Sequence, residues 1–568
     1  MRGYEKQCVL GPLFKLLEAS FELLIPLVVA KIVDHGIGGG DQSYVMKMCL
    51  VMILLGVIGL VCAVCAQYFA ADAAVSFSAR IRHALMDHIL GLSYSQIDTI
   101  GGSTLVTRMT SDINQVQNGV NLTLRLLLRS PFVVFGAMVM AFTIDFQAAL
   151  VFAGVIPVLC VIVFGIMLIT MPMYKRVQAS VDAVTSATRQ NLTGVRVLRA
   201  FCKEEAEISS FNEKTEELTE RQQKAGRISA LLNPVTLVVV NLAVILLVRI
   251  GAIKVNTGIL TQGLVIALYN YMSQILVELV KMANLIISIT KAVACGNRIA
   301  SVLEIEPSQV NGSLCGDRFA GKVEFQNVTL TYAGAKEAAL ENISFCAEPG
   351  KTVGIIGGTG SGKTTLVNLI PRLYDASSGE VLLDGIPVGN YDMEFLRHNI
   401  GIVPQKAVLF KGMVRDNLLW GNPQADEETL WRALEIAQGR EVVKSKEGEL
   451  DAQVEQGGMN FSGGQRQRLT IARALVRKPR ILILDDSGSA LDYATDAALR
   501  KSIREMEDSP TTFIVSQRAS SVRFADEILV LDDGCLVGKG THTELLESCQ
   551  VYQEIYYSQF PREVKSGE

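Results

Sequence analysis

The 568-residue chain has few charged residues and no excess of either sign. Asp, Glu, Lys and Arg make up only 19% of the sequence, and the formal net charge is −4. A chain of this composition has no overall basic field, so charge gives no support for nucleic-acid binding.

Histidine is scarce, and cysteine forms no recognisable framework. The chain has five histidines, and after residue 300 only His398 and His542 remain. The eleven cysteines are scattered. Cys62 and Cys65 lie in an apolar run, where we expect small buried thiols and no disulfide or metal pair. Nothing in this pattern suggests an oxidising compartment.

Apolar residues are abundant, at 49% of the chain, and they concentrate in its first half. A helical membrane span needs about 20 largely apolar residues. No small-residue cleavage site follows the first apolar stretch, so we expect it to be a retained helix and no signal peptide. The predicted spans are six, at residues 9–33, 45–71, 126–145, 148–171, 231–255 and 263–290.

Two long polar segments, 76–125 and 173–230, separate the spans into three pairs. Both segments are dense in Lys and Arg, whereas the connections within pairs are short and carry few. The positive-inside tendency therefore predicts that the long segments and both termini are cytoplasmic, in a multi-pass protein of the cell membrane. Because no strand pattern interrupts them, the segments are expected to be helical extensions of the spans, closed by short turns.

After residue 300 the pattern changes to short β-branched runs that alternate with helical segments, as in an α/β domain. The predicted fold class is an α-helical transmembrane domain followed by an α/β phosphate-loop domain. The predicted boundaries are 1–300 for the transmembrane domain, 301–321 for a linker, 322–562 for the α/β domain and 563–568 for a tail.

The stretch TVGIIGGTGSGKTTLVNLI reads as a strand, a glycine-rich loop and the start of a helix. It matches G-x-x-x-x-G-K-[ST], in which backbone N–H groups surround phosphates, Lys363 reaches the outer phosphates and Thr364 can ligate Mg²⁺. The residues predicted here to bind ATP are Gly357, Thr359, Gly360, Ser361, Gly362, Lys363, Thr364 and Thr365.

A second glycine cluster, NFSGGQRQRLTIARALV, opens another predicted helix, and ILILDD follows it. Taken alone, a short SGG would be a plain glycine turn. Together with the phosphate loop, however, Ser462, Gly463, Gly464 and Gln465 closely resemble the signature of ABC transporter nucleotide-binding domains. Six spans before one such domain resemble a half-transporter of the type IV exporter class, and the resemblance covers essentially the whole chain.

The resemblance implies further roles. Tyr332 would stack on adenine, Asp485 would hold Mg²⁺ together with Thr364, and Gln405 would contact the metal and the attacking water. Ser489 and Asp492, in SALD, would touch the opposite subunit. The segments DTIGGSTLVTRMTSDINQV and NLTGVRVLRAF would dock on the nucleotide-binding domains. ATP and Mg²⁺ are the implied cofactors.

Two positions depart from the family pattern. Where the family has a glutamate that positions the attacking water, this chain has Asp486, and where it has a switch histidine, this chain has Gln517. The aspartate is shorter by one C–C bond, about 1.5 Å, and a general base must lie within hydrogen-bond reach of its proton. Gln517 can donate a hydrogen bond but cannot become cationic.

Both changes affect hydrolysis and spare ATP binding, which resembles the degenerate-site subunit of a heterodimeric exporter. A partner chain would supply the glutamate and the histidine, and Ser462–Gln465 would complete the partner's site. Two alternatives remain: a homodimer with slow hydrolysis, in which a further water bridges the aspartate to the attacking water, or an ATP-gated membrane regulator that transports nothing.

The exporter resemblance implies amphipathic small molecules, lipids or peptides as substrates. Charges inside spans usually face a cavity or a partner. Glu278 and Lys281, three residues apart in the last predicted span, are expected either to form a structural ion pair or to face a substrate cavity.

Overall fold

The computed structural model describes residues 3–316 and 319–560. They form two compact units. Unit 1 contains the residues up to Leu90 together with Ser103–Ile305, and unit 2 contains Gly91–Gly102 together with the residues from Glu306 onward. A short internal segment thus belongs to the C-terminal unit.

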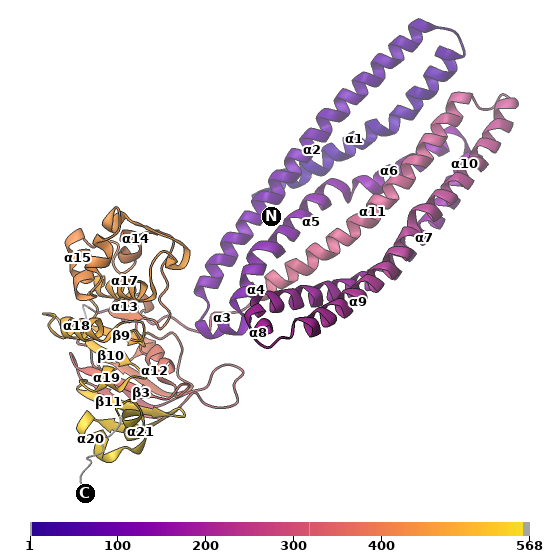
Figure 1. Ribbon diagram of the computed structural model, residues 1–568. Coiled ribbons are helices and arrows are strands. Elements are labelled where there is room, and N and C mark those ends of the chain that lie inside the picture. Colours follow the sequence, from indigo (N-terminus) through magenta and orange to yellow (C-terminus); the bar gives the residue numbers. More distant parts are fainter. Residues whose placement is uncertain (1–2, 317–318, 561–568) are drawn as a thin grey trace. The chain divides into compact units, whose positions relative to one another are not determined.

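Unit 1 consists of long helices (Figure 1). Small and branched side chains pack between α1, α6, α7, α10 and α11, with Phe152 and Tyr271 as the largest buried members. Its elements are α1 (Glu5–Lys31), η1 (Ile32–Ile37), α2 (Gln42–Gly91), α4 (Gly102–Thr107), η2 (Arg108–Asp112), α5 (Ile113–Leu126), α6 (Arg129–Ile144), α7 (Phe146–Thr193), α8 (Val195–Ala200), α9 (Glu204–Ala230), α10 (Leu232–Asn256) and α11 (Gln262–Leu303).

Five helical stretches of the described residues are long and apolar enough to cross a membrane, where the sequence predicts six spans. The five contain the predicted spans from 45–71 onward. The first predicted span, 9–33, is helical as α1 but is not among the five. Lys15, Glu18 and Glu22 lie in the middle of α1, and this concentration of charge lowers its hydropathy.

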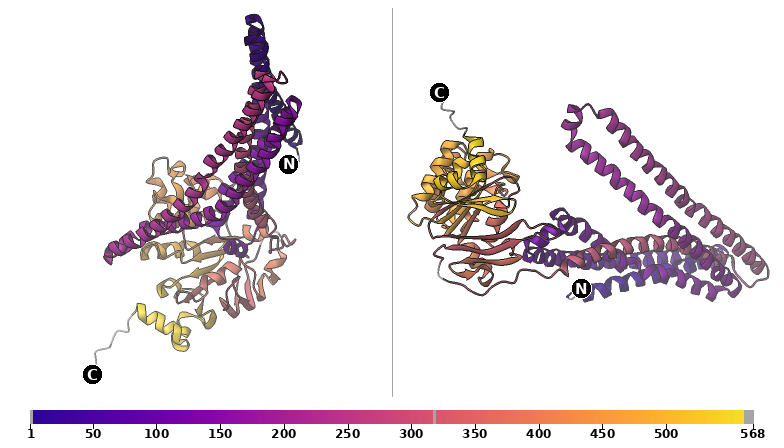
Figure 2. Two further views of the ribbon diagram at one scale, coloured as in Figure 1. Left: turned by 90° about the vertical axis from the view of Figure 1, so that its right-hand side faces the viewer. Right: turned by 90° about the horizontal axis from the view of Figure 1, so that it is seen from below.

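The helices extend well beyond the predicted spans. α2 runs without a break from Gln42 to Gly91, and α7 runs from Phe146 to Thr193. The expectation that the long polar segments are helical extensions is confirmed, and the short helices α3 (Tyr94–Ile100) and α8 lie at their turns. Figure 2 shows α7 and α9 running as a hairpin that diverges from the other helices of unit 1 towards α8.

Unit 2 is an α/β domain with three sheets. The orders are β12-β11-β3-β10-β9-β6, β2-β1-β4-β5 and β7-β8. The strands are β1 (Val323–Leu330), β2 (Leu340–Ala347), β3 (Thr352–Gly357), β4 (Ser378–Leu383), β5 (Ile386–Pro387), β6 (Ile400–Val403), β7 (Gly412–Met413), β8 (Gln453–Val454), β9 (Ile481–Asp485), β10 (Thr511–Val515), β11 (Glu527–Asp532) and β12 (Cys535–Gly540).

Unit 2 also contains helices and short helical turns. They are α3, α12 (Lys363–Leu369), η3 (Val388–Asn390), α13 (Met393–His398), α14 (Val414–Leu419), α15 (Glu427–Ile436), α16 (Arg440–Lys444), η4 (Glu449–Asp451), η5 (Gln456–Gly458), α17 (Gly463–Val476), α18 (Tyr493–Arg504), α19 (Ala519–Val522), α20 (His542–Ser548) and α21 (Gln550–Gln559).

The register of the six-stranded sheet brings distant sequence segments to one edge. β3, β9 and β10 are parallel neighbours, and Val515 at the end of β10 pairs with Asp485 of β9 and Ile355 of β3. Strand β9 is buried at every residue, as expected for a parallel strand covered on both faces. The segments that follow these strands therefore converge at their carboxyl ends, where α/β sheets bind ligands.

The predicted linker, 301–321, contains the end of α11 at Leu303 and then a segment attached to unit 2. The backbone N–H groups of Ser313 and Leu314 donate to the Asn390 carbonyl at 3.1 and 3.0 Å. The predicted tail, 563–568, lies outside the described residues.

Candidate functional site

A cavity of about 300 Å³ lies at the carboxyl edge of the six-stranded sheet. It brings together most of the residues that the sequence predicts for ATP binding and hydrolysis, with Ala339, Val515 and Ser516 in addition. The predicted residues that line it are Tyr332, Thr359, Gly360, Gly362, Lys363, Thr364, Thr365, Gln405, Asp485, Asp486 and Gln517. Gly357 and Ser361 belong to the same loop but do not line the cavity.

The glycine-rich loop has a backbone that requires glycine at several positions. Gly360 and Gly362 have φ angles of +86° and +90°, in the left-handed region. A Cβ on Gly357 would lie 2.1 Å from the Leu531 carbonyl oxygen. Lys363 Nζ donates to the Gly357 carbonyl at 3.0 Å and also to the Gly358 carbonyl. The lysine is thus held by the loop that would surround the phosphates.

Thr364 and Asp485 supply hard oxygen ligands side by side. Thr364 Oγ1 donates to Asp485 Oδ1 at 3.0 Å, although the residues lie 121 positions apart. Burial raises the pKa of the Asp485 carboxyl, and the neighbouring Asp486 raises it further against the effects of Thr364 and Lys363. Burial likewise lowers the pKa of Lys363, against the attraction of both aspartates.

The Asp485 carboxyl and the Thr364 hydroxyl together offer two oxygen atoms to a cation. Hydroxyl and carboxylate oxygens are the ligands that Mg²⁺ prefers, usually with phosphate oxygens and water. Among the described residues no group of three or more His, Cys, Asp or Glu side chains could hold a metal alone. The oxygen pair thus fits a magnesium ion that a bound nucleotide also coordinates.

Asp486 occupies a constrained position beside this pair. Its φ angle is +45°, a left-handed conformation that Asp tolerates better than most residues. Its backbone N–H donates to the Val515 carbonyl at 3.0 Å, which ties the residue to the end of β10. The side chain lies near Gln405, whose Nε2 is 3.5 Å from Asp486 Oδ2, at the outer limit for a hydrogen bond.

The signature residues lie outside this cavity. Ser462 is exposed and caps α17, because its Oγ accepts from the Gln465 backbone N–H while the Gln465 side chain accepts from the Ser462 N–H. Ser489 and Asp492 are also exposed, and Asp492 caps α18 by accepting from Thr495. Within this chain, Ser462 and Asp492 therefore serve as helix caps.

Tyr374, which sequence reasoning missed, connects α3 to the cavity within unit 2. Its hydroxyl donates to Asp98 Oδ2 at 2.7 Å. Its ring lies 6.2 Å from that of Tyr94 and 5.2 Å from that of Tyr332, nearly perpendicular to the latter. Tyr332 OH and Thr365 Oγ1 are 3.0 Å apart. Burial, followed by the bond to Asp98, raises the pKa of Tyr374.

In unit 1, Glu278 and Lys281 form an ion pair, one of the two arrangements expected for them, within a larger network. Lys281 Nζ lies 2.9 Å from Glu278 Oε1, while Ser130 Oγ donates to Glu278 Oε2 at 2.8 Å. Arg129 donates to Glu278 Oε1 and to Glu22 Oε2, each at 2.6 Å. The role of Arg129 was missed, and the only available sequence signal was a charged residue near the start of a predicted span.

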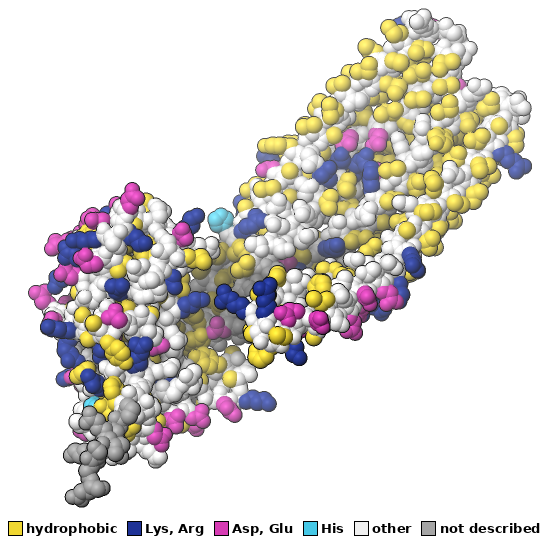
Figure 3. Space-filling view, in the orientation of Figure 1, with side chains coloured by type: hydrophobic (Ala, Val, Ile, Leu, Met, Phe, Trp, Pro, Cys, Tyr) yellow, Lys and Arg dark blue, Asp and Glu magenta, His cyan; other side chains and the backbone are white. Residues whose placement is uncertain are grey.

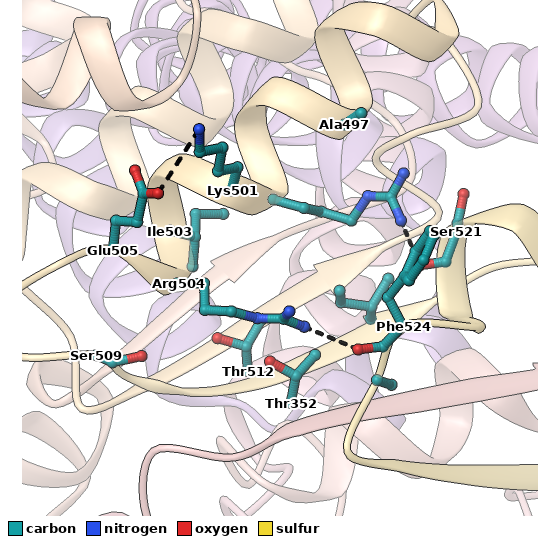
Figure 4. Close-up of a pocket in the computed structure, with 13 residues that line it drawn as sticks. Thr352, Ala497, Lys501, Ile503, Arg504, Glu505, Ser509, Thr512, Ser521 and Phe524 are labelled. Atoms are coloured by element: carbon teal, nitrogen blue, oxygen red, sulfur yellow. Dashed lines mark hydrogen bonds and ion pairs between the residues drawn. The ribbon is translucent and has the colours of Figure 1, made fainter. Parts of the chain in front are cut away.

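A second cavity of unit 2, of about 250 Å³, lies between α18, α19 and the parallel sheet (Figure 4). Its basic side chains already have partners. Arg504 donates to the Phe524 carbonyl at 2.8 Å, Lys501 lies 3.8 Å from Glu505, and Arg500 donates to the Ser521 carbonyl at 3.0 Å. The two arginine bonds join α18 to α19 and to the residue Phe524 beyond it, and the lysine pair lies at the end of α18 itself, so the cavity has a structural explanation.

Comparisons with known proteins match both units. The model of the ABC transporter transmembrane region matches residues 8–279, and that of the ABC transporter domain matches residues 340–489. An ABC transporter ATP-binding protein of Bacillus subtilis (strain 168) is 36% identical over 563 residues, which cover 99% of this chain and 98% of the relative.

More distant relatives carry a functional name. An ATP-dependent lipid A-core flippase of Escherichia coli (strain UTI89 / UPEC) is 29% identical over 550 residues, or 96% of this chain and 94% of the relative. The flippase of Vibrio vulnificus (strain CMCP6) is 27% identical over 565 residues, or 99% and 96%. The chain therefore belongs to the ABC transporter family, as a bacterial type IV exporter half-transporter whose transmembrane region precedes its ATP-binding domain.

Proposed function

We propose that this chain is one subunit of a heterodimeric exporter and that its own nucleotide site binds ATP but hydrolyses it slowly. The supporting observation is the contrast inside one cavity. The cavity keeps the glycine-rich loop, Lys363, Thr364 and Asp485, which are expected to hold phosphate and Mg²⁺, whereas Asp486 and Gln517 replace the glutamate and histidine of the family pattern.

In this proposal the loop and Lys363 bind the phosphates, and Thr364 and Asp485 hold Mg²⁺. The bound ion would neutralise charge on the outer phosphates. Gln405 would orient water beside Asp486, and Tyr332 would stack on adenine. Because the Asp486 carboxylate is withdrawn by about 1.5 Å, one C–C bond, it would remove a proton from that water poorly.

The partner would bind through surfaces that are exposed on this chain. Ser462 and Gly463 lie at the exposed start of α17, where they could complete a nucleotide site on another chain. Around α8, Leu192, Val197 and Phe201 expose apolar surface that would dock on the partner's nucleotide-binding domain. The partner's own acid and histidine would then drive most of the hydrolysis.

The transported molecules would be amphipathic small molecules, lipids or peptides. Relatives that span nearly the whole chain are named lipid A-core flippases, which favours a lipid-like substrate. The chain would lie in the cell membrane with both termini and unit 2 in the cytoplasm. ATP-driven closure of the two nucleotide-binding domains would turn a substrate cavity of the transmembrane domains from inward-facing to outward-facing. Hydrolysis would then return the transporter to the inward-facing state.

Restoring the longer acid tests this division of labour. The purified chain alone in nanodiscs should hydrolyse ATP slowly, and Asp486→Glu combined with Gln517→His should raise turnover about tenfold. A positioned base contributes roughly 10²–10⁴-fold, of which an untuned replacement should recover part. Phosphate release measures the effect.

Asp486→Asn is the matched control, because it preserves size and removes the carboxylate. It should leave the already slow turnover nearly unchanged. Brisk hydrolysis by the unmodified chain, lost in Asp486→Asn, would instead support a homodimer in which this aspartate is an effective base.

Tyr374→Phe tests whether α3 communicates with the nucleotide site. The variant loses the hydrogen bond to Asp98 and keeps the ring contacts. A hydrogen bond to a charged group contributes roughly 1.5–3 kcal/mol, so substrate stimulation of ATPase should fall about tenfold. ATP affinity should change little. Tyr94→Phe, which also keeps its ring, is the control, and equal effects of both variants would contradict the assignment.

A further inference from the structure

The charged network of unit 1 has a buried centre and an open rim. Arg129 and Glu278 form the centre, with 8% and 4% of their side chains exposed. Glu22 and Lys281 form the rim, with 37% and 46% exposed. Each rim residue is bonded to the central residue of opposite charge. The exposed ends of the network are thus one carboxylate and one ammonium group.

Both rim residues line a cavity of about 470 Å³ between α1, α6 and α11. Ile25, Pro26, Val133 and Val277 give it an apolar wall, and Asn270, Ser273 and Gln274 give it polar groups. The lining thus divides between apolar and polar side chains, and the volume lies within the range of about 300–1,000 Å³ that is usual for small-molecule sites. Figure 3 shows positive and negative side chains together within the hydrophobic surface of unit 1.

One polar atom of this wall has no partner. Gln274 Oε1 is buried and has no hydrogen-bond partner among the described residues. Burial of an unsatisfied acceptor is unfavourable, so this side chain is poorly satisfied where it stands in the cavity wall.

The network contains two acids and two bases, so its formal charge is zero. A ligand with a net charge would leave one uncompensated charge beside the buried Arg129–Glu278 pair, which is costly. A ligand with one anionic and one cationic group would add a partner to each rim residue and keep the balance. The charges therefore select against ions of either sign.

We propose that this cavity binds the head of a zwitterionic amphiphile. Lys281 contacts its phosphate or carboxylate, and Glu22 contacts its ammonium group. The apolar wall contacts the adjoining chain. This inference rests on the proposed export of amphipathic molecules and specifies their headgroup.

The test compares dye-labelled amphiphiles that share a twelve-carbon tail and differ in the head: phosphocholine, phosphate or trimethylammonium. Binding to the full transporter in nanodiscs is measured by fluorescence anisotropy. Binding to a Glu22→Gln, Lys281→Met double variant is subtracted to remove partitioning into the bilayer. The phosphocholine compound should bind about tenfold more tightly than either ion, as one further ion contact allows.

Single variants test each contact. Lys281→Met should weaken phosphocholine binding about tenfold and leave trimethylammonium binding nearly unchanged, and Glu22→Gln should weaken both. Lys254→Met is the matched control, because Lys254 is a paired cation of unit 1, bonded to Asp145 at 2.5 Å, that does not line the cavity. Equal affinity for all three heads, or tighter binding of the phosphate compound, would overturn the proposal.

Two sources of a zwitterion are separated by competition. Lysophosphatidylethanolamine should displace the labelled phosphocholine if the natural ligand is a lipid, and trileucine should displace it if the ligand is a hydrophobic peptide. Displacement by neither would contradict the proposal. ATP turnover of the same preparations is measured in parallel. If the three labelled compounds bind with equal affinity while ATP turnover is as proposed, this inference is refuted and the proposed function is left intact.

Discussion

Ser462→Arg is expected to abolish nearly all ATP turnover of the assembled transporter, whereas Lys363→Ala should leave a substantial part. If this chain's signature completes the partner's site, an arginine at Ser462 blocks the site that hydrolyses ATP. Loss of one preorganised donor to a developing anion typically costs on the order of 10²–10³ in rate. Lys363 serves the slow site, so its loss should mainly weaken ATP binding there.

The measurement is steady-state phosphate release by the co-purified pair, together with ATP bound per complex after rapid filtration. Thr541→Arg is a matched control, because Thr541 is also an exposed capping-box residue of unit 2, at the start of α20. It should perturb that cap and leave turnover nearly unchanged. A larger loss in Lys363→Ala than in Ser462→Arg would mean that the roles of the two sites are reversed.

Glu278→Ala is expected to destabilise the membrane domain more than any other single substitution discussed above. It removes one of the two carboxylates that pair with Arg129 among the described residues, and the buried guanidinium would keep its bond to Glu22. Breaking a buried ion pair by removing one partner costs about 3–5 kcal/mol, because the remaining charge is uncompensated. The loss should appear as a lower midpoint of thermal unfolding in nanodiscs and as poor recovery from the membrane.

Two comparisons isolate the cause. Glu278→Gln retains hydrogen-bonding atoms for Arg129 and Ser130 and should be less destabilising. Glu220→Ala removes an exposed i,i+4 partner of Lys224 and should leave the unfolding midpoint unchanged, since solvent screens such pairs. Similar midpoints for Glu278→Ala and Glu220→Ala would show that the network contributes little to stability and would leave ligand binding as its main use.

Local chemistry explains why the phosphate loop could be recognised from the sequence. Its glycines, Lys363 and Thr364 lie within eight consecutive residues. The glycines are needed for the backbone conformation of the loop, and Lys363 and Thr364 make contacts from that same loop. The same holds for Ser462 and Gln465, which form their capping box three residues apart. Hydropathy likewise located the membrane-spanning stretches after α1, because an apolar stretch of sufficient length is a property of composition.

Helix ends and the status of α1 were less predictable. Hydropathy marks where a helix leaves an apolar region but not where it stops, so the spans predicted to end at 71 and 171 belong to helices that continue to Gly91 and Thr193. The charges in the middle of α1 lower its hydropathy, yet these are paired: Lys15 with Glu18 at 2.5 Å, and Glu22 with Arg129. A hydropathy average treats these side chains as unpaired charges, because it takes no account of ion pairs.

The sequence by itself determined the family, the two-part α-helical and α/β architecture, and the shortened acid at Asp486. The motifs and the hydropathy depend on residues that are neighbours in the sequence, and the short acid depends on the covalent length of the aspartate side chain. Both can be read directly from the amino-acid sequence. Only the tertiary structure decided that Arg129 bonds Glu278 across 149 positions, that Tyr374 joins Asp98 to Tyr332, and that Glu22 and Lys281 share one cavity. Such contacts arise when separate helices and strands pack, and neither periodicity nor spacing encodes which distant side chains then meet.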